Sequence, residues 1–328
     1  MQQSATSIEI GDYSIPPGKK QQLDLPVARL PTQTQLSLPV TVINGSQPGP
    51  RLWLSAAIHG DELNGVEIIR QVLTQVQPKQ LRGSLIAVPI VNVFGFIEQS
   101  RYLPDRRDLN RSFPGSPRGS LASRLAHLFM REVVSRCTHG IDLHTASHHR
   151  SNWPQIRANL ADSETYRCAM AFNAPLMIQS SMRDGSLRQA AAQQGIPVLL
   201  YEAGEALRFD AEAIEIGVEG VLRVMNALEM FTAERLSAES QSIEVKSSQW
   251  ARASRSGILH MQVALGEVVQ KRQLLGVILD AFGNRSAKVQ SPYEGIVIGC
   301  TRNPLVNQGD AILHVAKLPE AGKTDVET

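Results

Sequence analysis

The sequence predicts an α/β protein with a mixed, mainly parallel sheet flanked by helices, followed by a C-terminal all-β domain. Apolar runs of strand length alternate with segments of helical periodicity from residue 51 to about residue 231. Beyond residue 248, short β-prone runs alternate with glycine turns instead. The chain of 328 residues also exceeds the usual size of one hydrophobic core. Two domains of different class are therefore expected.

The N-terminal region and the first strand–helix unit have the clearest local patterns. Residues 1–43 alternate apolar stretches with proline, as in LDLPVARLP and LSLPVTVI, which predicts short strands at an edge of the sheet. The run LWLSAAI at 52–58 is almost wholly apolar, as in a strand buried on both faces of a parallel sheet. Residues 63–76 place apolar side chains at helical spacing. We expect a strand, a short polar turn at His59 and then a helix.

The rest of the first domain continues this alternation. Strands are expected at 84–93, 140–145 and 197–204, and helices at 123–136, 185–195 and 211–231. A long polar loop separates two of these elements, from Glu98 to Ser120. Because such units build a mainly parallel sheet with helices on both faces, ligands are expected at the carboxyl ends of the strands.

The composition changes at residues 237–248, which are polar and follow neither period, so we predict a linker there. It would join a first domain at 1–236, including the N-terminal β extension, to a β domain at 249–318 and a tail at 319–328. The β region contains a weak internal repeat, in which Gly257 matches Gly295 and Val269 matches Val306. Two similar halves predict a small pseudo-symmetric barrel or sandwich.

Charge and composition exclude several classes of function. The formal net charge is only +2, and the sequence contains no long Lys/Arg run. We therefore expect no nucleic-acid partner. The sequence has neither an apolar stretch of transmembrane length nor the apolar core of a signal peptide at its N-terminus, so a cytoplasmic protein is expected. Cys137, Cys168 and Cys300 are odd in number and widely separated, which indicates free thiols. Whether the chain forms a homo-oligomer is left open.

The strongest chemical signal is His59-Gly60-Asp61-Glu62 at the end of one predicted strand, with Asp142-Leu143-His144-Thr145 in another. Hydrolytic zinc sites take three imidazole and carboxylate ligands and keep one position for water, and His59, Glu62 and His144 supply such a set. Asp142 lies two residues before His144 and is expected on the same face of the strand, where it would orient an imidazole. The alternative interpretation is that polar residues merely close two loops.

Two other features fit this site. The loop after residue 100 contains Arg101, Arg106, Arg107 and Arg111, and guanidinium groups suit bidentate binding of a carboxylate. A solvated basic loop is the alternative there. Glu202 ends an apolar strand, where its carboxylate would activate a water and protonate a leaving amine. A capping or ion-pairing glutamate is the alternative for that position.

Together these motifs resemble the succinylglutamate desuccinylase/aspartoacylase family of the zinc carboxypeptidase-like superfamily. The resemblance runs in order from about residue 50 to residue 205 through HGDE with Asn64-Gly65, RDLNRSFPG at 107–115, DLHT and Glu202-Ala203-Gly204. It implies one Zn²⁺ per chain on His59, Glu62 and His144.

The resemblance also implies roles for other residues. Glu202 would be the general base and acid, and Asn110 and Arg111 would bind the substrate carboxylate. Arg101 matches the arginine that polarises the scissile carbonyl, although two extra residues before Asp108, relative to the family pattern, make Arg107 the alternative. Arg157 is a further candidate for contact with the acyl group.

The implied activity is hydrolysis of the amide bond of a small N-acyl amino acid. Peptide carboxypeptidase or ester hydrolase activity on the same site is the alternative among enzymes, and a non-catalytic zinc- or ligand-binding protein is the alternative of another class. The C-terminal domain is similar to biotinyl/lipoyl-like barrel-sandwich domains. Gly283 stands where carrier domains of that type have their modified lysine, so no attached cofactor is expected.

Overall fold

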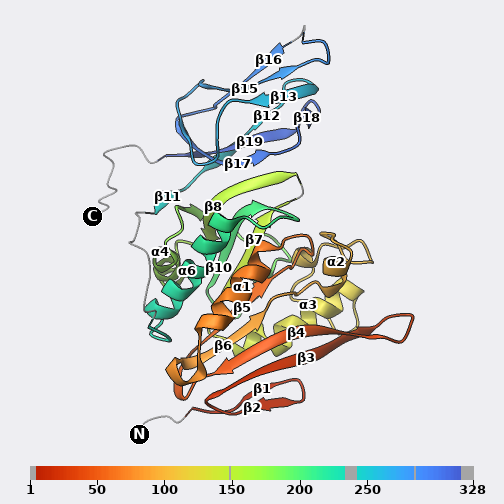
Figure 1. Cartoon of the computed structure of the whole chain (residues 1–328), viewed down its shortest axis with the longest axis vertical. Helices are drawn as coiled ribbons and strands as arrows, with labels where there is room; N and C mark the ends of the chain where they lie inside the picture. The colour runs from red at the N-terminus through yellow and green to blue at the C-terminus, as the bar shows by residue number, and fades with distance from the viewer. Residues whose placement is uncertain (1–4, 148, 233–241, 284–285, 319–328) are drawn as a thin grey trace.

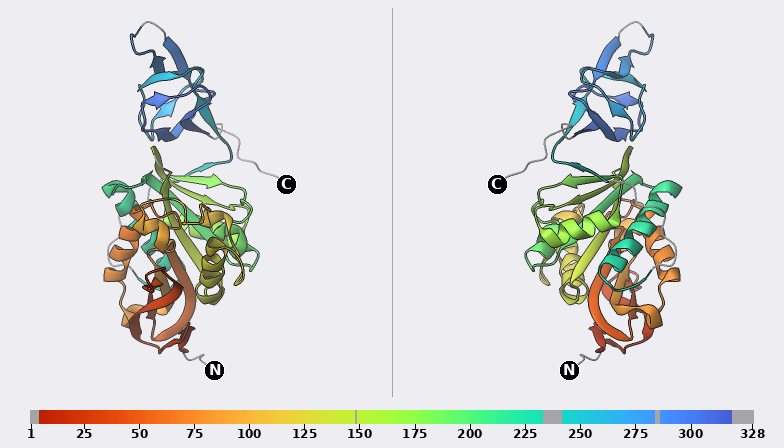
Figure 2. Two further views of the ribbon diagram at one scale, coloured as in Figure 1. Left: turned by 90° about the vertical axis from the view of Figure 1, so that its right-hand side faces the viewer. Right: turned by 90° about the vertical axis from the view of Figure 1, so that its left-hand side faces the viewer.

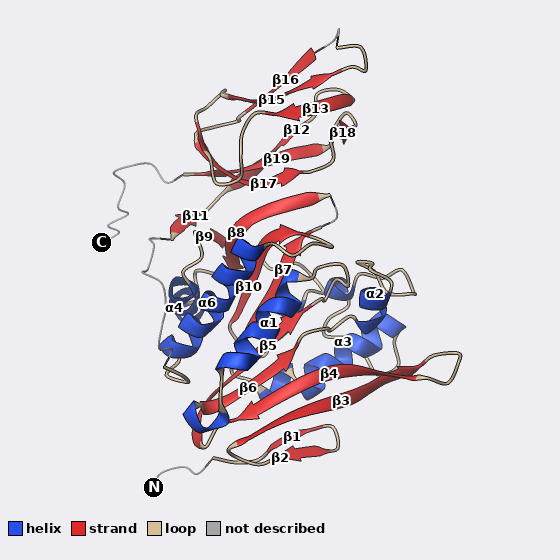
Figure 3. Cartoon of the chain, in the orientation of Figure 1, coloured by secondary structure: helices blue, strands red, loops and turns tan. Residues whose placement is uncertain are grey.

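The structure is a computed structural model that describes residues 5–147, 149–232, 242–283 and 286–318. A long mixed sheet forms its centre and continues from the N-terminal to the C-terminal part of the chain (Figures 1 and 3). In sheet order its strands are β3 (Lys19–Arg29), β4 (Gln35–Asn44), β6 (Arg82–Val88), β5 (Gln47–Ala56), β7 (His139–Ala146), β10 (Val198–Glu205), β8 (Arg150–Ala158), β17 (Gly295–Thr301), β19 (Ala311–Lys317) and β12 (Ser248–Arg252).

The middle of this sheet is parallel, and helices cover both of its faces (Figure 2). Strands β6, β5, β7 and β10 run parallel, and their apolar residues pack on both sides. One face packs against α1 (Asn64–Gln75), α4 (Ser163–Phe172) and α6 (Ala211–Ala227). The other face packs against α2 (Val93–Ile97), α3 (Leu121–Glu132) and α5 (Leu187–Ala192). The expected mixed α/β class is confirmed.

The N-terminal segment forms an antiparallel extension of the sheet, as its proline-interrupted apolar runs predict. Strand β3 pairs with β4, and β4 pairs with β6. A hairpin of β1 (Ile8–Ile10) and β2 (Tyr13–Ile15) buries its isoleucines in the same core as α3. None of the described helices is long and apolar enough to cross a membrane.

Strand β8 connects the two parts of the molecule. It pairs antiparallel with β10 along most of its length, with β17 through Arg150–Asn152, and with β9 (Leu176–Gln179) through Gln155–Ala158. Strand β11 (Ile243–Val245) extends β9 in parallel. Leu176, Ile178 and Val245 then pack against Ile296 and Ile298 of β17. The α/β part of the chain and the C-terminal region are thus joined by backbone pairing and by an apolar seam.

The C-terminal region has its own apolar core and a second sheet. That sheet has the order β16 (Ser286–Gln290), β15 (Leu274–Leu279), β13 (Gly257–Met261) and β18 (Leu305–Val306), while β14 (Val268–Val269) pairs with β17. The repeated residues of the sequence meet reciprocally, because Gly257 pairs with Val306 and Gly295 pairs with Val269. The internal repeat is therefore a structural one.

Several elements differ from the sequence-based expectations. The sequence did not predict two helices, α2 and α4, or two strands, β8 and β9. Helix α2 is short, and the apolar residues of α4, β8 and β9 follow no clear period. Residues 237–241 of the predicted linker 237–248 lie outside the described residues. Within the rest of the linker, Ile243–Val245 forms β11. The predicted tail 319–328 also lies outside the described residues.

Candidate active site

The predicted site residues come together at one end of three neighbouring parallel strands. His59 follows β5, His144 lies near the end of β7, and Glu202 lies near the end of β10. Strand β7 lies between the other two, and Glu202 is directly opposite His144 in the β10–β7 register. This is where a doubly wound sheet places its ligands.

His59, Glu62 and His144 form a buried cluster whose ligand atoms all lie within 4.8 Å of one another. The two carboxylate oxygens of Glu62 lie 2.7 Å from His59 Nδ1 and 2.7 Å from His144 Nδ1. The backbone N–H of Thr145 donates to the second of these oxygens at 3.2 Å. The Glu62 carboxylate thus lies between two imidazole nitrogens, with His59 and Glu62 in the loop after β5 and His144 in β7.

The outer nitrogen of each imidazole faces another carboxylate. His144 Nε2 lies 2.8 Å from Asp142 Oδ2, and the hydroxyl of Ser55 donates to the other oxygen of Asp142 at 2.8 Å. His59 Nε2 lies 3.1 Å from Asp108 Oδ1. Carboxylates in this position fix the ring orientation of metal-binding histidines and increase their basicity. The donor set and its outer partners therefore fit a zinc ion.

The charges of the cluster also favour a cation. Burial opposes ionisation of Glu62, but His59 and His144 outweigh it and hold the pKa of that carboxyl well below its usual range. Burial likewise opposes ionisation of Asp108, and His59 and Arg101 overcome it, so that its pKa is also lowered. Although burial lowers the pKa of His144, Asp142 and Glu62 raise it well above the usual value. The carboxylates of Glu62 and Asp108 are therefore ionised beside the histidine ring nitrogens.

Two glycines of the predicted motifs are required by close contacts. A Cβ on Gly60 would lie 1.9 Å from the carbonyl carbon of Gly95, so that the turn before Glu62 packs directly on the α2 backbone. Gly204 has a φ of +75°, and a Cβ there would lie 2.6 Å from the amide nitrogen of Asn64. Asn64 in turn donates to the carbonyl of Ala203. These contacts fix the loop after β5 against α2, and the start of α1 against the end of β10.

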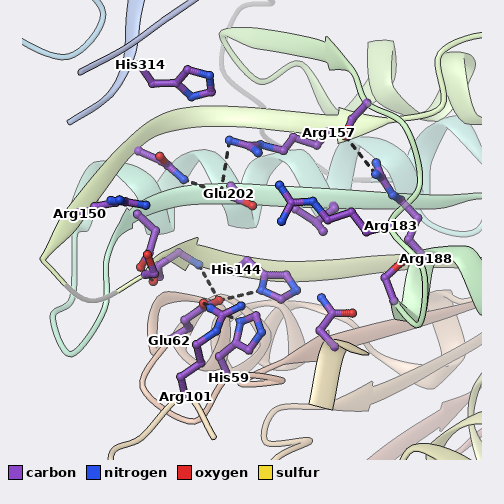
Figure 4. A pocket seen from close by; sticks show the side chains of 18 of the residues that line it. His59, Glu62, Arg101, His144, Arg150, Arg157, Arg183, Arg188, Glu202 and His314 are labelled. Atoms are coloured by element: carbon purple, nitrogen blue, oxygen red, sulfur yellow. Dashed lines mark hydrogen bonds and ion pairs between the residues drawn. The ribbon is translucent and has the colours of Figure 1, made fainter. Parts of the chain in front are cut away.

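Glu202 is held by two groups from β8. The side-chain amide of Asn152 donates a hydrogen bond to Glu202 Oε2, and Arg157 Nη2 lies 3.8 Å from the same oxygen. Figure 4 shows Glu202 across from His144 and Glu62. A carboxylate in this place is able to accept a proton from a water beside the metal cluster and to donate it to a leaving nitrogen.

The site opens into a cavity of about 440 Å³ that is rich in arginine. The arginines that line it are Arg101, Arg111, Arg150, Arg157, Arg183 and Arg188. Arg188 is 8% exposed, and burial, followed by repulsion from Arg157, lowers its pKa to about 10. It remains a cation at neutral pH. Because the lining carboxylates are Glu62 and Glu202 alone among the described residues, the cavity favours an anionic ligand.

The structure brings most of the predicted residues into this cavity. Asn110 and Arg111 line it, and the Asn110 side chain accepts a hydrogen bond from the backbone of Leu187 at 2.9 Å. Arg101 lies between Glu62, at 3.4 Å, and Asp108, at 2.9 Å. Arg107 is not among the lining residues. Its side chain is 63% exposed and lies 3.8 Å from Asp105.

Sequence reasoning missed several residues of the site. Asp108 lies within the motif RDLNRSFPG, but its contact with His59 forms only when the loop folds back toward β5, so the sequence does not reveal it. Asn152 and Arg150 lie on the unpredicted strand β8. The C-terminal region supplies Ser248, Trp250 and His314 to the cavity wall. No pattern in the sequence marked Arg183 and Arg188, which are the only arginines of the segment RDGSLR at 183–188.

Comparison with known proteins agrees with this geometry. The family model of the succinylglutamate desuccinylase/aspartoacylase catalytic domain matches residues 48–228, which is more than half of the chain. The chain belongs to this family. The match covers β5 to α6 and thus His59, Glu62 and His144 as well as Glu202.

Desuccinylase/aspartoacylase relatives extend the likeness over nearly the whole chain. The N-alpha-acetyl-L-2,4-diaminobutyric acid deacetylase of Halomonas elongata is 27% identical over 297 residues, which are 87% of this chain and 86% of the relative. A succinylglutamate desuccinylase/aspartoacylase structure from Rhodobacter sphaeroides is 26% identical with a TM-score of 0.81, covering 92% of this chain and 96% of the other. The product-bound ectoine utilization protein EutE (DoeB) from Ruegeria pomeroyi shares the fold at 24% identity, a TM-score of 0.82, and coverage of 92% and 97%.

These matches place the chain in a family of deacylases. The whole-chain coverage also means that the C-terminal β region belongs to the shared fold. A second group of potential ligands, the half-buried His139 and Glu164 with the buried Cys168, is not among the residues that line the cavity. There Glu164 is paired with Arg167 at 2.5 Å, and both nitrogens of His139 have partners, so this group is a poorer cation site.

Proposed function

We propose that this protein is a zinc-dependent deacylase that hydrolyses the amide bond of a small N-acyl amino acid or a related carboxylate-bearing substrate. The observation that carries the proposal is the position of Glu202 directly beside the His59–Glu62–His144 cluster, in a cavity lined by arginine. One zinc ion per chain would be held by His59, Glu62 and His144. When bound there, zinc supplies a Lewis acid for the carbonyl group and lowers the pKa of a water molecule.

The side chains of this protein would complete the reaction. Glu202 accepts a proton from the attacking water and then donates it to the departing nitrogen, with Asn152 and Arg157 holding the carboxylate in place. Arg101, beside Glu62, stabilises the oxygen that gains negative charge. Asn110 and Arg111 bind the carboxylate of the amino acid, and Arg188 adds positive charge at the same end of the cavity.

The C-terminal region would act as part of the site wall. We propose that it is a barrel-sandwich domain, because the reciprocal pairing of Gly257 with Val306 and of Gly295 with Val269 relates its two halves. Its residues Ser248, Trp250 and His314 line the cavity. A cavity closed in this way suits a small substrate better than an extended peptide.

The proposal is tested with zinc-loaded protein and a panel of N-acyl amino acids, with blocked dipeptides and esters in parallel. Hydrolysis of N-acyl amino acids supports a deacylase, whereas cleavage of blocked dipeptides alone would show a carboxypeptidase. In the Glu202→Gln variant we expect bound zinc to be retained and turnover to fall by about a hundredfold or more. Near wild-type turnover would remove Glu202 from the mechanism. Stoichiometric zinc without turnover on any substrate would show a non-catalytic protein.

A further inference from the structure

We propose that the protein has a second anion-binding site, at the amino ends of β5 and β6, which takes a small molecule through a phosphate or carboxylate group. The site is a cavity of about 820 Å³ between the start of these strands and the N-terminal segment that includes Ala5 and Thr6. The active-site residues follow the carboxyl ends of the parallel strands, so this cavity lies at their opposite end. Among the described residues, none lines both cavities.

Three polar side chains from neighbouring strands form one row at this cavity. Strand β6 lies between β4 and β5 (Figure 3), and Ser84 of β6 is directly opposite both Asn44 of β4 and Arg51 of β5. Side chains of directly opposite residues project from the same face of a sheet. Polar groups therefore replace the apolar core at the point where the cavity opens. Two positions deeper in the sheet, the same face carries the core residues Val42, Ile86 and Trp53.

The charged residues that line the cavity are positive. They are Arg51 and Arg82, and no aspartate or glutamate is among the described lining residues. The side chain of Arg82 is 51% exposed and lies 3.7 Å from Glu229, so part of its charge is balanced. Arg51 is half-buried and forms no ion pair with any described residue, and its guanidinium donates to the backbone carbonyl of Arg136 at 3.5 Å. Its remaining N–H groups are available for an anion.

The hydroxyl of Ser84 is the second donor of the site. Ser84 is 1% exposed, and its Oγ has no hydrogen-bond partner among the described residues. Buried hydroxyl groups normally have a partner, because leaving one unpaired is unfavourable. Since Ser84 and Arg51 are direct neighbours in the β5–β6 register, one oxyanion is able to accept hydrogen bonds from both.

One wall of the cavity is a backbone bulge in β5. Gln47 pairs with Arg82 and Arg51 pairs with Ser84, so four steps along β5 match two steps along β6. The residues between them, at 48–50, are Pro-Gly-Pro, and the two prolines have no N–H for the ladder. Gly83 has a φ of +73°, and a Cβ there would lie 1.8 Å from the carbonyl oxygen of Pro50. The bulge thus packs backbone on backbone and forms a fixed wall.

The opposite wall is the N-terminal segment, which Asn44 attaches to the sheet. The side-chain amide of Asn44 donates to the carbonyl of Thr6 at 3.0 Å and to that of Ile15 at 2.9 Å. Thr6 and Ile8 line the cavity beside the polar row. A ligand between this segment and Arg51 would add contacts that are broken when the segment opens. Binding should therefore slow local opening of residues 5–15.

The cavity fits an oxyanion that belongs to a small organic molecule. Its volume of about 820 Å³ lies within the range of small-molecule sites and exceeds what a single phosphate fills. Guanidinium and hydroxyl donors bind the oxygens of phosphates and carboxylates alike. The two anion types are distinguished by their relative affinity.

Hydrogen exchange of the full chain, measured by mass spectrometry, tests the site with inorganic phosphate, malonate and sodium chloride at equal ionic strength. A local readout is needed because the arginine-rich active-site cavity also attracts anions. We expect peptides from residues 5–15 to exchange about tenfold more slowly at a phosphate or malonate concentration of about ten times Kd, and sodium chloride to have no such effect. The anion that protects at the lower concentration identifies the group that the natural ligand carries.

Variants assign the protection to this cavity. Arg51→Met should abolish it, and Ser84→Ala should weaken anion binding by about tenfold. Arg29→Met replaces an exposed arginine of β3 that does not line the cavity, and it should keep the wild-type protection. Arg188→Met, which removes a cation from the active-site cavity, should keep it as well.

Two results would overturn the proposal. One is the absence of protection by both anions up to ~100 mM, a concentration at which even a millimolar site is filled. The other is protection that persists in Arg51→Met or is lost in Arg188→Met, since the anion would then act from another place. If Arg51→Met fails to fold, Arg51→Lys keeps the charge but loses the planar fork, and we expect about tenfold weaker binding. Unchanged affinity in Arg51→Lys and Ser84→Ala would equally contradict the site.

Discussion

The side-chain amide of Asn152 donates a hydrogen bond to the carboxylate of Glu202 from the adjacent antiparallel strand. Because this bond orients the proposed base, we expect Asn152→Ala to lower kcat by about tenfold with little change in KM or zinc content. Steady-state kinetics with metal analysis measures this. Asn159→Ala, which removes an amide just beyond the same strand, is the matched control, and equal losses in both variants would contradict a specific role for Asn152.

Gly299 connects the C-terminal region to the same hydrogen bond. A Cβ at this position of β17 would lie 2.9 Å from Asn152 Oδ1 and 3.3 Å from the Cβ of His314. The Asn152 side chain is the group that is free to move, so Gly299→Ala should turn its amide away from Glu202. We expect kcat to fall by about tenfold, as in Asn152→Ala, without loss of zinc. Val268→Ala in β14 should leave kcat unchanged, and an unaltered kcat in Gly299→Ala would show that the strand yields instead.

Asp108 should affect metal affinity through His59. Its carboxylate lies 3.1 Å from His59 Nε2, while Arg101 holds its other oxygen at 2.9 Å. Removal of a carboxylate beside a ligand histidine typically costs about 10- to 100-fold in metal affinity, and we expect this loss for Asp108→Asn. Competition with a zinc chelator measures it. Asp12→Asn, on the exposed N-terminal hairpin, should bind zinc as the wild type does, and unchanged affinity in Asp108→Asn would contradict the assignment.

The metal cluster itself is tested by paired histidine variants. His144→Ala removes one of the three proposed ligands, and we expect it to lose both zinc and activity. His139→Ala alters the second group of potential ligands, which we expect to hold no ion, so this variant should keep one zinc per chain. Mass spectrometry of metal content after dialysis distinguishes them. Zinc lost from His139→Ala and retained in His144→Ala would reverse the assignment of the site.

Glu132 should stabilise the N-terminal hairpin in a pH-dependent way. Burial raises the pKa of its carboxyl, but hydrogen bonds from the Gly11 backbone, Arg136 and Arg131 outweigh burial and lower the pKa overall. A lowered folded-state pKa means that the stabilisation is present above the unfolded-state pKa, about 4.3, and is lost as the pH falls through the folded-state value.

We therefore expect Glu132→Gln to reduce the free energy of unfolding by about 1–2 kcal/mol at pH 7 and by much less once the pH lies below the lowered folded-state pKa. Urea unfolding at several pH values measures the difference. Glu98→Gln, at an exposed position, should have little effect at any of them. A destabilisation that stays constant across this pH range would show that the ionised form is not what matters.

The parts of the fold that the sequence predicts are those with a strong local period. LWLSAAI became β5 and residues 211–231 became α6, because a buried strand and an amphipathic helix each have a characteristic spacing of apolar residues. Strand β8 was missed because it pairs with three different strands along its length and is lined partly by polar side chains of the cavity. The order of polar and apolar residues in β8 is set by these different neighbours, so it does not show the two-residue period of a regular strand.

The site residues likewise fall into those that the sequence predicts and those that it does not. Residues next to predicted strand ends, such as His59 and His144, were identifiable because the topology alone brings those ends together. Asp108, Asn152 and Arg150 are positioned by contacts made across loops or between strands, and no spacing in the sequence specifies such contacts. The wall formed by Trp250 and His314 depends on how the C-terminal strands dock on β8.

The pairing of β8 with both β10 and β17 also makes the C-terminal region inseparable from the rest of the protein. A chain truncated after α6 would leave the β17 side of Arg150–Asn152 with unpaired backbone groups and would expose Ile178 and other apolar residues of the seam. Exposed strand edges of this kind recruit strands from other molecules. A protein without this β region is therefore expected to associate with other molecules through that edge and to lose solubility.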